Sequence, residues 1–205
     1  DGLSSDFVMN IVEDSLGMLW FSTYGGGITC WNNGQPIHYT KAVGLPNNTV
    51  WTSLKDHHNT LWFGSSSGLF RYEDGAFKSI LPVNDQKSSK VTYLFEDTKH
   101  RIWIGGQYGV WIKLGDTIVF NQVKDEMKGN NIRAIEEDHR GAIWLGSQIG
   151  LYKYVSGNYQ YVKINPEEEA LTVYCIKNIN QQLWVGTNNG LFVKKGNTFE
   201  KILLD

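Results

Sequence analysis

The sequence predicts an all-β protein: a β-propeller, or propeller segment, of five four-stranded antiparallel blades. Two observations lead to this prediction. A pair formed by an aliphatic residue and Trp recurs five times, and the spacings between successive Trp residues are 42, 41, 41 and 40. The composition is rich in Gly (22 residues) and aromatic residues (13%) but poor in Pro (4 residues), which is typical of short strands joined by tight turns. A period near 40 with four strands per unit is the pattern of a propeller.

The five units share a frame that is centred on the Trp. The Trp residues are Trp20, Trp62, Trp103, Trp144 and Trp184. Six residues before them stand Asp14, Asp56, Asp97 and Asp138, with Asn178 in place of the turn Asp in the fifth unit. Two residues after them stand Ser22, Gly64, Gly105, Gly146 and Gly186. We therefore expect one domain whose blades cover approximately residues 1–43, 44–84, 85–126, 127–166 and 167–205.

The second unit illustrates the elements of a blade. The first strand is expected at residues 49–55, followed by a turn at 56–60 whose residues bond their own backbone. The second strand is expected at 61–64, the third at 69–72 and the fourth at 76–81. No segment keeps a helical period beyond one turn. The Trp of the second strand is expected to pack between neighbouring blades, because a single blade cannot bury both faces.

Charge and hydropathy exclude several classes of function. The chain has 19 Lys and Arg against 21 Asp and Glu, a net charge of -2, which argues against binding to nucleic acid. No run of about 18 apolar residues occurs, so we expect no membrane contact within this segment. The chain begins with Asp1 and has no leader sequence, so we expect it to be a piece of a longer protein whose targeting signal lies outside it.

At this point the motifs resemble a known family. Residues 2–5 and 11–27, and again residues 137–147, resemble the two-component regulator propeller repeat. The resemblance implies a non-catalytic, periplasmic sensor region of a bacterial hybrid two-component receptor of the Bacteroidetes type, in which many members detect breakdown products of complex glycans. Such receptors usually carry two seven-bladed propellers, a β-sandwich, a membrane helix and a kinase. Because this chain has five units, it is either a segment of a longer array, which we favour, or a five-bladed ring.

The resemblance also sets the expected partners. They are an oligosaccharide ligand, the neighbouring propeller or β-sandwich domains of the same receptor, and a second copy of the chain in a homodimer. If the chain is a segment, its end blades are expected to expose apolar faces. Two alternatives to a sensor remain open: a protein-interaction scaffold, and a propeller enzyme similar to streptogramin lyases. No cofactor is expected.

Three patterns that could carry chemistry are better explained by structure. Residues 64–68 match G-x-S-x-G, but this motif needs a following helix and here a strand is expected. Paired carboxylates recur once per blade, as in Glu13 and Asp14, and neighbours in a strand point to opposite faces. We expect the Asp to cap its own turn. Four histidines fall in the same turn of different blades, so no metal site is expected: His57, His58, His100 and His139. His38 stands alone in a fourth strand.

The two cysteines, Cys30 and Cys175, are too few for a disulfide scaffold or a zinc site. A bond between them is conceivable only if units one and five are neighbours in a closed ring. Cys175 aligns with Ile11, Ser53, Leu94 and Ile135, which form a packing column. We therefore expect two buried, free thiols.

The candidate ligand-binding residues lie in the variable loops. In a propeller, the loop from the second to the third strand and the loop between blades emerge on one face. Polar and aromatic side chains in these loops suit sugar recognition, because amides bind hydroxyl groups and aromatic faces stack on sugar rings. The residues selected are Tyr24, Ser66, Gln107, Tyr108, Gln148, Asn188 and Asn189, together with Arg133 on a first strand near the axis. The loops between blades add Asn47, Asn48, Lys87, Ser88, Lys128, Asn130, Asn131 and Glu167 to Glu169.

Overall fold

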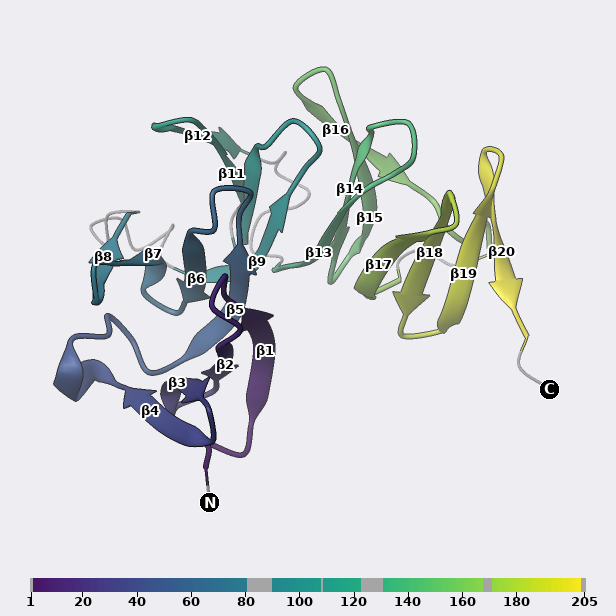
Figure 1. The fold of residues 1–205 in the computed structure, drawn as a ribbon. Coiled ribbons are helices and arrows are strands. Elements are labelled where there is room, and N and C mark those ends of the chain that lie inside the picture. The colour runs from purple at the N-terminus through teal and green to yellow at the C-terminus, as the bar shows by residue number, and fades with distance from the viewer. Residues whose placement is uncertain (1, 81–89, 108, 123–130, 168–170, 204–205) are drawn as a thin grey trace. The chain divides into compact units, whose positions relative to one another are not determined.

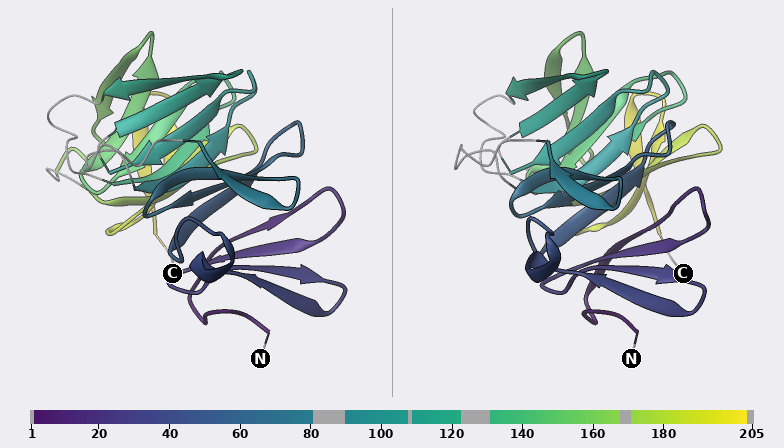
Figure 2. Two further views of the ribbon diagram at one scale, coloured as in Figure 1. Left: turned by 90° about the vertical axis from the view of Figure 1, so that its left-hand side faces the viewer. Right: turned by 60° about the vertical axis from the view of Figure 1, so that its left-hand side comes forward.

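The computed structural model describes residues 2–80, 90–107, 109–122, 131–167 and 171–203. These residues form five four-stranded antiparallel sheets, one after another along the chain, so the predicted all-β fold of five blades is confirmed (Figure 1). Figure 2 shows the strands of each blade lying side by side. The helical structure among the described residues is one 3-10 turn, η1 at Lys41–Val43, and none of their helices has the length and apolarity to cross a bilayer.

Each blade runs in sequence order from its first to its fourth strand. Blade 1 contains β1 (Val8–Glu13), β2 (Leu19–Thr23), β3 (Gly27–Asn32) and β4 (Gln35–Tyr39). Blade 2 contains β5 (Val50–Lys55), β6 (Leu61–Ser65), β7 (Gly68–Glu73) and β8 (Ala76–Ser79). Blade 3 contains β9 (Val91–Glu96), β10 (Ile102–Gly106), β11 (Gly109–Leu114) and β12 (Thr117–Gln122). Blade 4 contains β13 (Ile132–Glu137), β14 (Ile143–Ser147), β15 (Gly150–Val155) and β16 (Asn158–Val162). Blade 5 contains β17 (Val173–Ile179), β18 (Gln182–Thr187), β19 (Gly190–Lys195) and β20 (Thr198–Ile202).

The chain divides into two compact units, residues 1–96 and 97–205, which we describe separately. In both units the conserved frame of the sequence has a direct structural role. The turn Asp accepts two backbone N–H groups with one carboxylate oxygen and the indole N–H of its Trp with the other. In the first unit, Asp56 Oδ1 accepts from the backbone of His58 and Thr60, and Oδ2 accepts from Trp62 Nε1 at 2.8 Å. The prediction that the Asp caps its own turn is confirmed.

Neighbouring blades meet where a glycine of one faces a β-branched residue of the next. A Cβ added to Gly64 would lie 2.5 Å from Val91 Cγ1 in the first unit, and one added to Gly105 would lie 2.8 Å from Ile132 Cγ2 in the second. The same overlap joins Gly146 to Val173. In blades 2 to 4, glycine at this position leaves room for the following first strand, since a larger side chain would force the close-packed strands apart. Blade 1 has the small Ser22 at this position.

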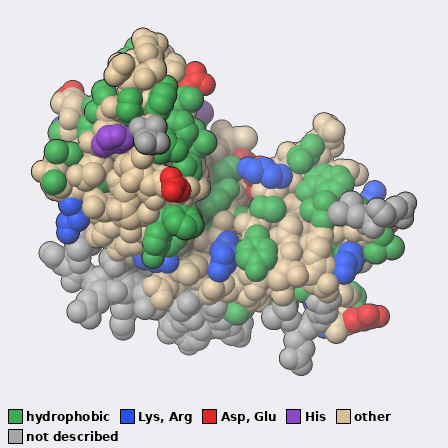
Figure 3. Space-filling view, turned by 90° about the horizontal axis from the view of Figure 1, so that it is seen from below, with side chains coloured by type: hydrophobic (Ala, Val, Ile, Leu, Met, Phe, Trp, Pro, Cys, Tyr) green, Lys and Arg blue, Asp and Glu red, His purple; other side chains and the backbone are tan. Residues whose placement is uncertain are grey.

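The Trp residues pack between blades as predicted. Trp20 is buried, and its ring lies 5.9 Å from Phe63 and 4.7 Å from Tyr72, both in blade 2. Trp144 is buried in a cluster that includes Val173 and Ile176 of blade 5. By contrast, the outer side of β1 has no blade against it in the first unit. Hydrophobic side chains are exposed on the surface (Figure 3), and those of the first eleven residues are Leu3, Phe7, Val8, Met9 and Ile11.

Blade 5 departs from the alignment that the sequence suggested. Its first turn is a two-residue hairpin between the paired residues Ile179 and Gln182, and both Asn180 and Gln181 have positive φ. The hairpin is shorter than the turn of the other blades, so the strand register is displaced by one residue. Asn178 pairs with Leu183 just as Glu137 pairs with Ile143, so Asn178 replaces the Glu of the frame. The prediction that it stands in place of the turn Asp is wrong.

The same displacement corrects the prediction for the second cysteine. Cys175 pairs with Gly186 as Ala134 pairs with Gly146, so the packing column continues through Ile176 instead. Ile176 is 1% exposed, whereas Cys175 is exposed. Both thiols are free, as expected, but only Cys30 is buried.

Candidate functional site

The predicted clustering of loops can be tested inside each unit. In the first unit, the loop between blades 1 and 2 bonds to the turns after β2 and β6. Asn47 Nδ2 donates to Ser67 Oγ at 2.6 Å, and the backbone oxygen of Asn48 accepts from Gly27 N at 2.8 Å. In the second unit, Thr172 joins the turns after β14 and β18. Its Oγ1 donates to the backbone oxygen of Gln148, and its backbone N–H donates to Asn188 Oδ1. We call this end of the blades the loop end.

In the first strands β1, β5, β13 and β17, a β-bulge places one variable residue at the loop end. The strand register shifts between Val50 and Thr52, between Ile132 and Ala134, and between Val173 and Cys175. A bulge leaves one residue outside the regular ladder and redirects its side chain. The redirected residues are Trp51, Arg133 and Tyr174, with Met9 at the matching shift in β1.

In the first unit, these side chains form a cluster that we call the Trp51 cluster: Tyr24, Trp51, Ser66 and Lys90. The Trp51 indole N–H donates to Ser66 Oγ at 2.9 Å. The Tyr24 ring meets Trp51 edge-on with a centroid distance of 5.5 Å, and Lys90 Nζ lies 4.1 Å from the Trp51 ring. Tyr24 is 53% exposed. The cluster therefore offers an aromatic surface, a hydroxyl and an ammonium group in one place.

The structure brings together two of the predicted ligand-binding residues of this unit, Tyr24 and Ser66, through Trp51. Sequence reasoning did not select Trp51 or Lys90. The available signal was the variable position just after the Val of the first strand, where Trp51 follows Val50. That position looked like part of a buried strand, and only the bulge turns it outward.

In the second unit, the predicted residues divide into two sets. Gln148 and Asn188 are held close by Thr172, and Arg133 lies with its guanidinium carbon 5.4 Å from the Tyr174 ring, a residue that sequence reasoning also missed. Asn189 Oδ1 instead accepts from Lys201 Nζ at 3.1 Å, which directs it toward β20. Gln107 is half-buried after β10 and makes no contact that places it with the others. Tyr108, Lys87, Ser88, Lys128, Asn130, Glu168 and Glu169 lie outside the described residues.

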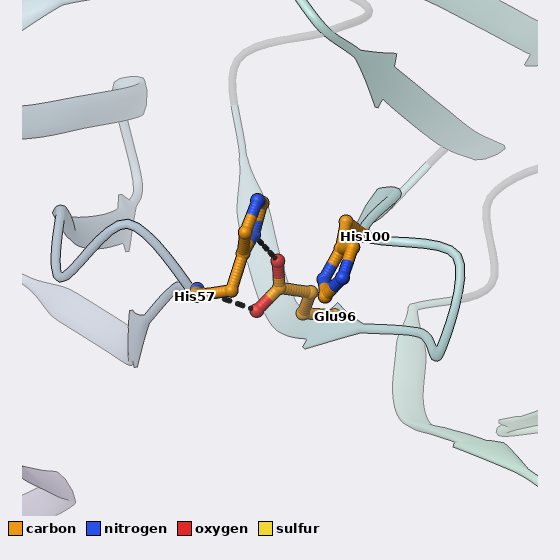
Figure 4. Close-up of side chains that lie close together, drawn as sticks. All are labelled: His57, Glu96 and His100. Carbon is orange, nitrogen blue, oxygen red and sulfur yellow. Dashed lines mark hydrogen bonds and ion pairs between the residues drawn. The ribbon is translucent and has the colours of Figure 1, made fainter.

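The opposite end of the blades holds the histidines and the paired carboxylates. Figure 4 shows His57 bonded through both its backbone N–H and its ring Nδ1 to the carboxylate of Glu96, which reaches back from β9 to the turn of blade 2. In the second unit, Glu137 does the same for Thr98, accepting from its N–H at 2.7 Å and its Oγ1 at 2.8 Å. The Glu of one blade thus caps the turn of the preceding blade.

This arrangement assigns the paired carboxylates a structural role. The Asp of each pair holds its own turn, and Glu96 and Glu137 hold the turn of the preceding blade, so the two carboxylates of these pairs do not converge on a common point. Where another residue replaces the Glu, it reaches a backbone oxygen of the preceding blade. Lys55 Nζ donates to the Asp14 oxygen at 3.5 Å, and Asn178 Nδ2 donates to the Glu137 oxygen at 3.2 Å. The turns that contain His57, His58, His100 and His139 all lie between first and second strands, as predicted. The G-x-S-x-G residues 64–68 form a strand, a turn and a strand.

Burial and hydrogen bonding shift several pKa values in these regions. Burial alone raises the pKa of Asp97, but the hydrogen bonds from Trp103 and Arg101 outweigh it and leave the pKa below its ordinary value. The pKa of Asp138 is lowered for the same reason, and its indole donor is Trp144. Burial, assisted by the charge of Asp14, raises the pKa of Cys30 to about 11. These groups are structural, and none of them lies in the Trp51 cluster.

Parts of the chain match a known protein family, and the whole fold resembles solved structures. Residues 2–25, 44–67 and 126–148 match the family described as two component regulator propeller. No curated protein matches the chain. The chain is similar to the extracellular domain of a protein assigned as the hybrid two component system BT3049 from B. thetaiotaomicron, with 27% identity and a TM-score of 0.82 over 98% of this chain and 29% of that one.

Two further solved structures are similar to the chain. The extracellular domain of BT4673 from B. thetaiotaomicron, assigned as a one component system, is 22% identical, with a TM-score of 0.81 over 95% of this chain and 28% of that one. Virginiamycin B lyase from Staphylococcus aureus is 17% identical, with a TM-score of 0.75 over 96% of this chain and 70% of the lyase. At these identities the likeness shows the fold alone. The chain spans less than a third of the two B. thetaiotaomicron chains.

Proposed function

Because residues 2–25, 44–67 and 126–148 are two-component regulator propeller repeats, we propose that the chain is a non-catalytic ligand-binding segment of a bacterial two-component receptor. Its place is extracytoplasmic, in the periplasm, and its ligand is a carbohydrate. Binding would favour one packing arrangement of the receptor and so change the activity of a kinase across the membrane. The similarity to the extracellular domain of BT3049 supports the receptor assignment.

The observation that carries the ligand assignment is the Trp51 cluster. A sugar presents an apolar ring face together with a belt of hydroxyl groups. The exposed Tyr24 ring provides a stacking surface, and the adjacent Ser66 and Lys90 provide polar atoms beside it. Loops that are already hydrogen-bonded to each other lose little conformational entropy when a ligand binds. The bond from Asn47 to Ser67 supplies this preorganisation.

A non-catalytic role is supported by where the titratable residues lie. Four histidines and the recurring Glu–Asp pairs lie at the end of the blades opposite the Trp51 cluster, in or beside the turns between the first and second strands. The histidines are His57, His58, His100 and His139. The four turn Asp residues, Glu96 and Glu137 already accept hydrogen bonds that hold a turn. Histidine is the general acid or base that enzymes use most often, and the residues that form the Trp51 cluster are Tyr24, Trp51, Ser66 and Lys90, without a histidine or a carboxylate. The similarity to virginiamycin B lyase is a similarity of fold alone.

The test is thermal unfolding of the protein in the presence of neutral and acidic oligosaccharides. A ligand at about 100 times its Kd stabilises the folded state by about 2.7 kcal/mol, which gives a clear rise in Tm. We expect a shift with one class of glycan, which Trp51→Ala and Tyr24→Ala reduce. Tyr161→Ala, which removes a partly exposed ring from β16, is the control and should leave the shift unchanged. A cooperative melt that no oligosaccharide shifts would contradict the proposal.

One observation favours a second function, that of a protein-interaction scaffold. The outer side of β1 exposes Phe7 (71%) and Ile11 (54%), and an exposed apolar surface of this kind marks an interaction site. Light scattering at increasing protein concentration tests this function. Concentration-dependent association that Ile11→Lys abolishes, together with no response to oligosaccharides, would favour the scaffold.

A further inference from the structure

Arg133 and Tyr174 form a pair at the loop end of the second unit. Each is the bulge residue of its first strand, Arg133 in β13 and Tyr174 in β17. The Arg133 guanidinium carbon lies 5.4 Å from the centroid of the Tyr174 ring, so the two side chains from neighbouring blades contact each other. Tyr174 is 52% exposed. The pair therefore presents a half-exposed aromatic ring with a positive charge over one of its faces.

Arg133 has no anionic partner among the described residues. The ion pairs of the second unit join Arg101 to Asp97 and Lys177 to Glu136, and neither involves Arg133. The Nε of Arg133 is buried and has no described hydrogen-bond acceptor. A guanidinium group keeps its charge at every physiological pH, and a buried N–H without an acceptor is costly. Such a group is expected where a ligand supplies the missing acceptor.

A second unsatisfied polar atom lies two residues away. The side-chain oxygen of Asn131 is also buried and has no described donor. Asn131 precedes Ile132, which pairs with Ser147, and Ser147 leads directly into the turn that contains Gln148. The segment thus holds, two residues apart, a donor without an acceptor at Arg133 Nε and an acceptor without a donor at Asn131 Oδ1.

The backbone around this pair is held in place. Thr172 Oγ1 donates to the Gln148 oxygen at 2.9 Å, and Thr172 N donates to Asn188 Oδ1 at 2.9 Å. The residue after Thr172 is Val173, which is fully buried, and Tyr174 follows it. The segment that carries Tyr174 is therefore hydrogen-bonded to the turns of blades 4 and 5. A ligand that contacts the ring would lose little conformational entropy of the protein on binding.

We propose that Arg133, Tyr174 and Asn131 form a binding site for an acidic sugar. The Tyr174 ring stacks on the sugar ring, Arg133 binds its carboxylate or sulfate, and Asn131 accepts a hydrogen bond from a hydroxyl group. This inference rests on the proposed function and narrows its ligand to a charged class. The chain has a net charge of -2, so general attraction does not favour anions, and the selectivity comes from Arg133 itself.

The test follows the side-chain Nε–H signal of Arg133 and the ring signals of Tyr174 by NMR during titration. The probes are glucuronate, galacturonate, a 6-sulfated N-acetylglucosamine, neutral glucose and galactose, and inorganic sulfate. At a probe concentration of about 10 mM, a site with a Kd of about 1 mM is occupied to about 90%. We expect the acidic sugars to shift both sets of signals, and the comparison of uronates with the sulfated sugar identifies the anionic group.

Variants separate the role of the charge from that of the fold. Arg133→Gln should weaken binding of the acidic sugar by about tenfold or more, because it removes a charge-assisted hydrogen bond. Arg140→Gln makes the same change at the exposed turn at the other end of β13 and should alter affinity by less than about twofold. Tyr174→Phe should keep binding and Tyr174→Ala should lose it. Thermal unfolding of each variant verifies that it is folded.

Each other outcome overturns the inference. If neutral sugars shift Tyr174 as strongly as acidic ones and Arg133→Gln has no effect, the acidic class is wrong while the proposed function stands. If inorganic sulfate binds as tightly as the sulfated sugar, the site recognises an anion and no sugar. If no sugar shifts any signal of the folded protein, both this inference and the proposed function fail.

Discussion

The carboxylate of Asp138 accepts the indole N–H of Trp144 at 2.8 Å and ties the first turn of blade 4 to its buried centre. The other oxygen of the same carboxylate accepts the backbone N–H groups of Arg140 and Ala142. Three donors thus depend on one side chain. The relation recurs as Asp14 with Trp20, Asp56 with Trp62 and Asp97 with Trp103. It explains why the two residue types keep a spacing of six along the chain.

Replacing this carboxylate by its amide tests the relation. In Asp138→Asn, either the indole or the two backbone N–H groups of the turn must face an NH2 group, which cannot accept a hydrogen bond. We expect the free energy of unfolding to fall by about 1–3 kcal/mol, the cost of a buried donor without an acceptor. Urea denaturation measures the change. The control Asp116→Asn, in the exposed turn between β11 and β12, should stay within about 0.5 kcal/mol of the unchanged protein.

The lowered pKa values of Asp97 and Asp138 predict a loss of stability in acid. Because each folded-state pKa lies below the ordinary value of 3.8, the ionised carboxylates stabilise the fold above that pH. This contribution is lost as the pH falls through the folded-state values. We expect Tm to be flat near neutrality and to fall below about pH 4. In the double variant with Asn at both positions, the decline should be smaller. An equally steep decline in the variant would assign the acid sensitivity to other groups.

The glycine that stands two residues after the Trp in blades 2 to 5 predicts a contrast between blades. Gly146 faces Val173 of the next blade, whereas at the equivalent Gly186 the side chain within 3 Å is the exposed Cys175. Gly146→Ala should therefore destabilise the protein by about 1–3 kcal/mol through overpacking. Gly186→Ala should cost less, since the thiol can rotate away. Equal effects in denaturant unfolding would show that the glycines serve something other than the approach of the following strand.

The two thiols should differ in reactivity. Cys175 is exposed, whereas Cys30 is 1% exposed with a pKa raised to about 11, so little of its thiolate exists at neutral pH. We expect iodoacetamide to alkylate Cys175 in the native protein and Cys30 only after unfolding. Mass spectrometry of the digested protein locates the label. Rapid native labelling of Cys30 would mean that the core of blade 1 opens readily.

The hairpin of blade 5 offers a stabilising substitution. Asn180 and Gln181 both have positive φ, as in the two-residue turns that favour Asn followed by Gly. Gln181→Gly relieves the strain of a side chain in this conformation and should raise the stability by about 0.5–1 kcal/mol. The neighbouring Gln182→Gly, placed in β18, should lower it. A fall in Tm for Gln181→Gly would contradict the assigned turn geometry.

The repeat made most of the fold predictable, because each strand and turn recurs at a fixed distance from a Trp. In blade 2, the predicted first three strands match β5, β6 and β7 to within one residue at each end. The error in blade 5 arose because its shorter hairpin displaces the register by one, and counting from Trp184 alone cannot reveal a missing turn residue. Asn178 and Cys175 were both misplaced by that single step.

The candidate site was predictable in position but less so in membership. Tyr24 and Ser66 are predicted because variable loop residues gather at one end of a propeller, and Arg133 because it is a basic residue on a first strand near the axis. Trp51 and Tyr174, which contact them, were hidden inside strand patterns. A β-bulge changes which way one residue points without altering the alternation around it, so a sequence pattern gives little warning of it.

The contact of Gly64 with Val91 recurs as Gly105 with Ile132 and as Gly146 with Val173, so a glycine on one side of a blade meets a β-branched residue of the next blade at three successive steps. The two sides of such a blade differ, and each blade can be added in one direction only. The contact is the same at these three steps and contains no information about how many blades precede or follow it. Duplication or loss of one repeat in a gene would change the number of blades without requiring a new interface, so the blade count is free to vary while the local structure stays the same.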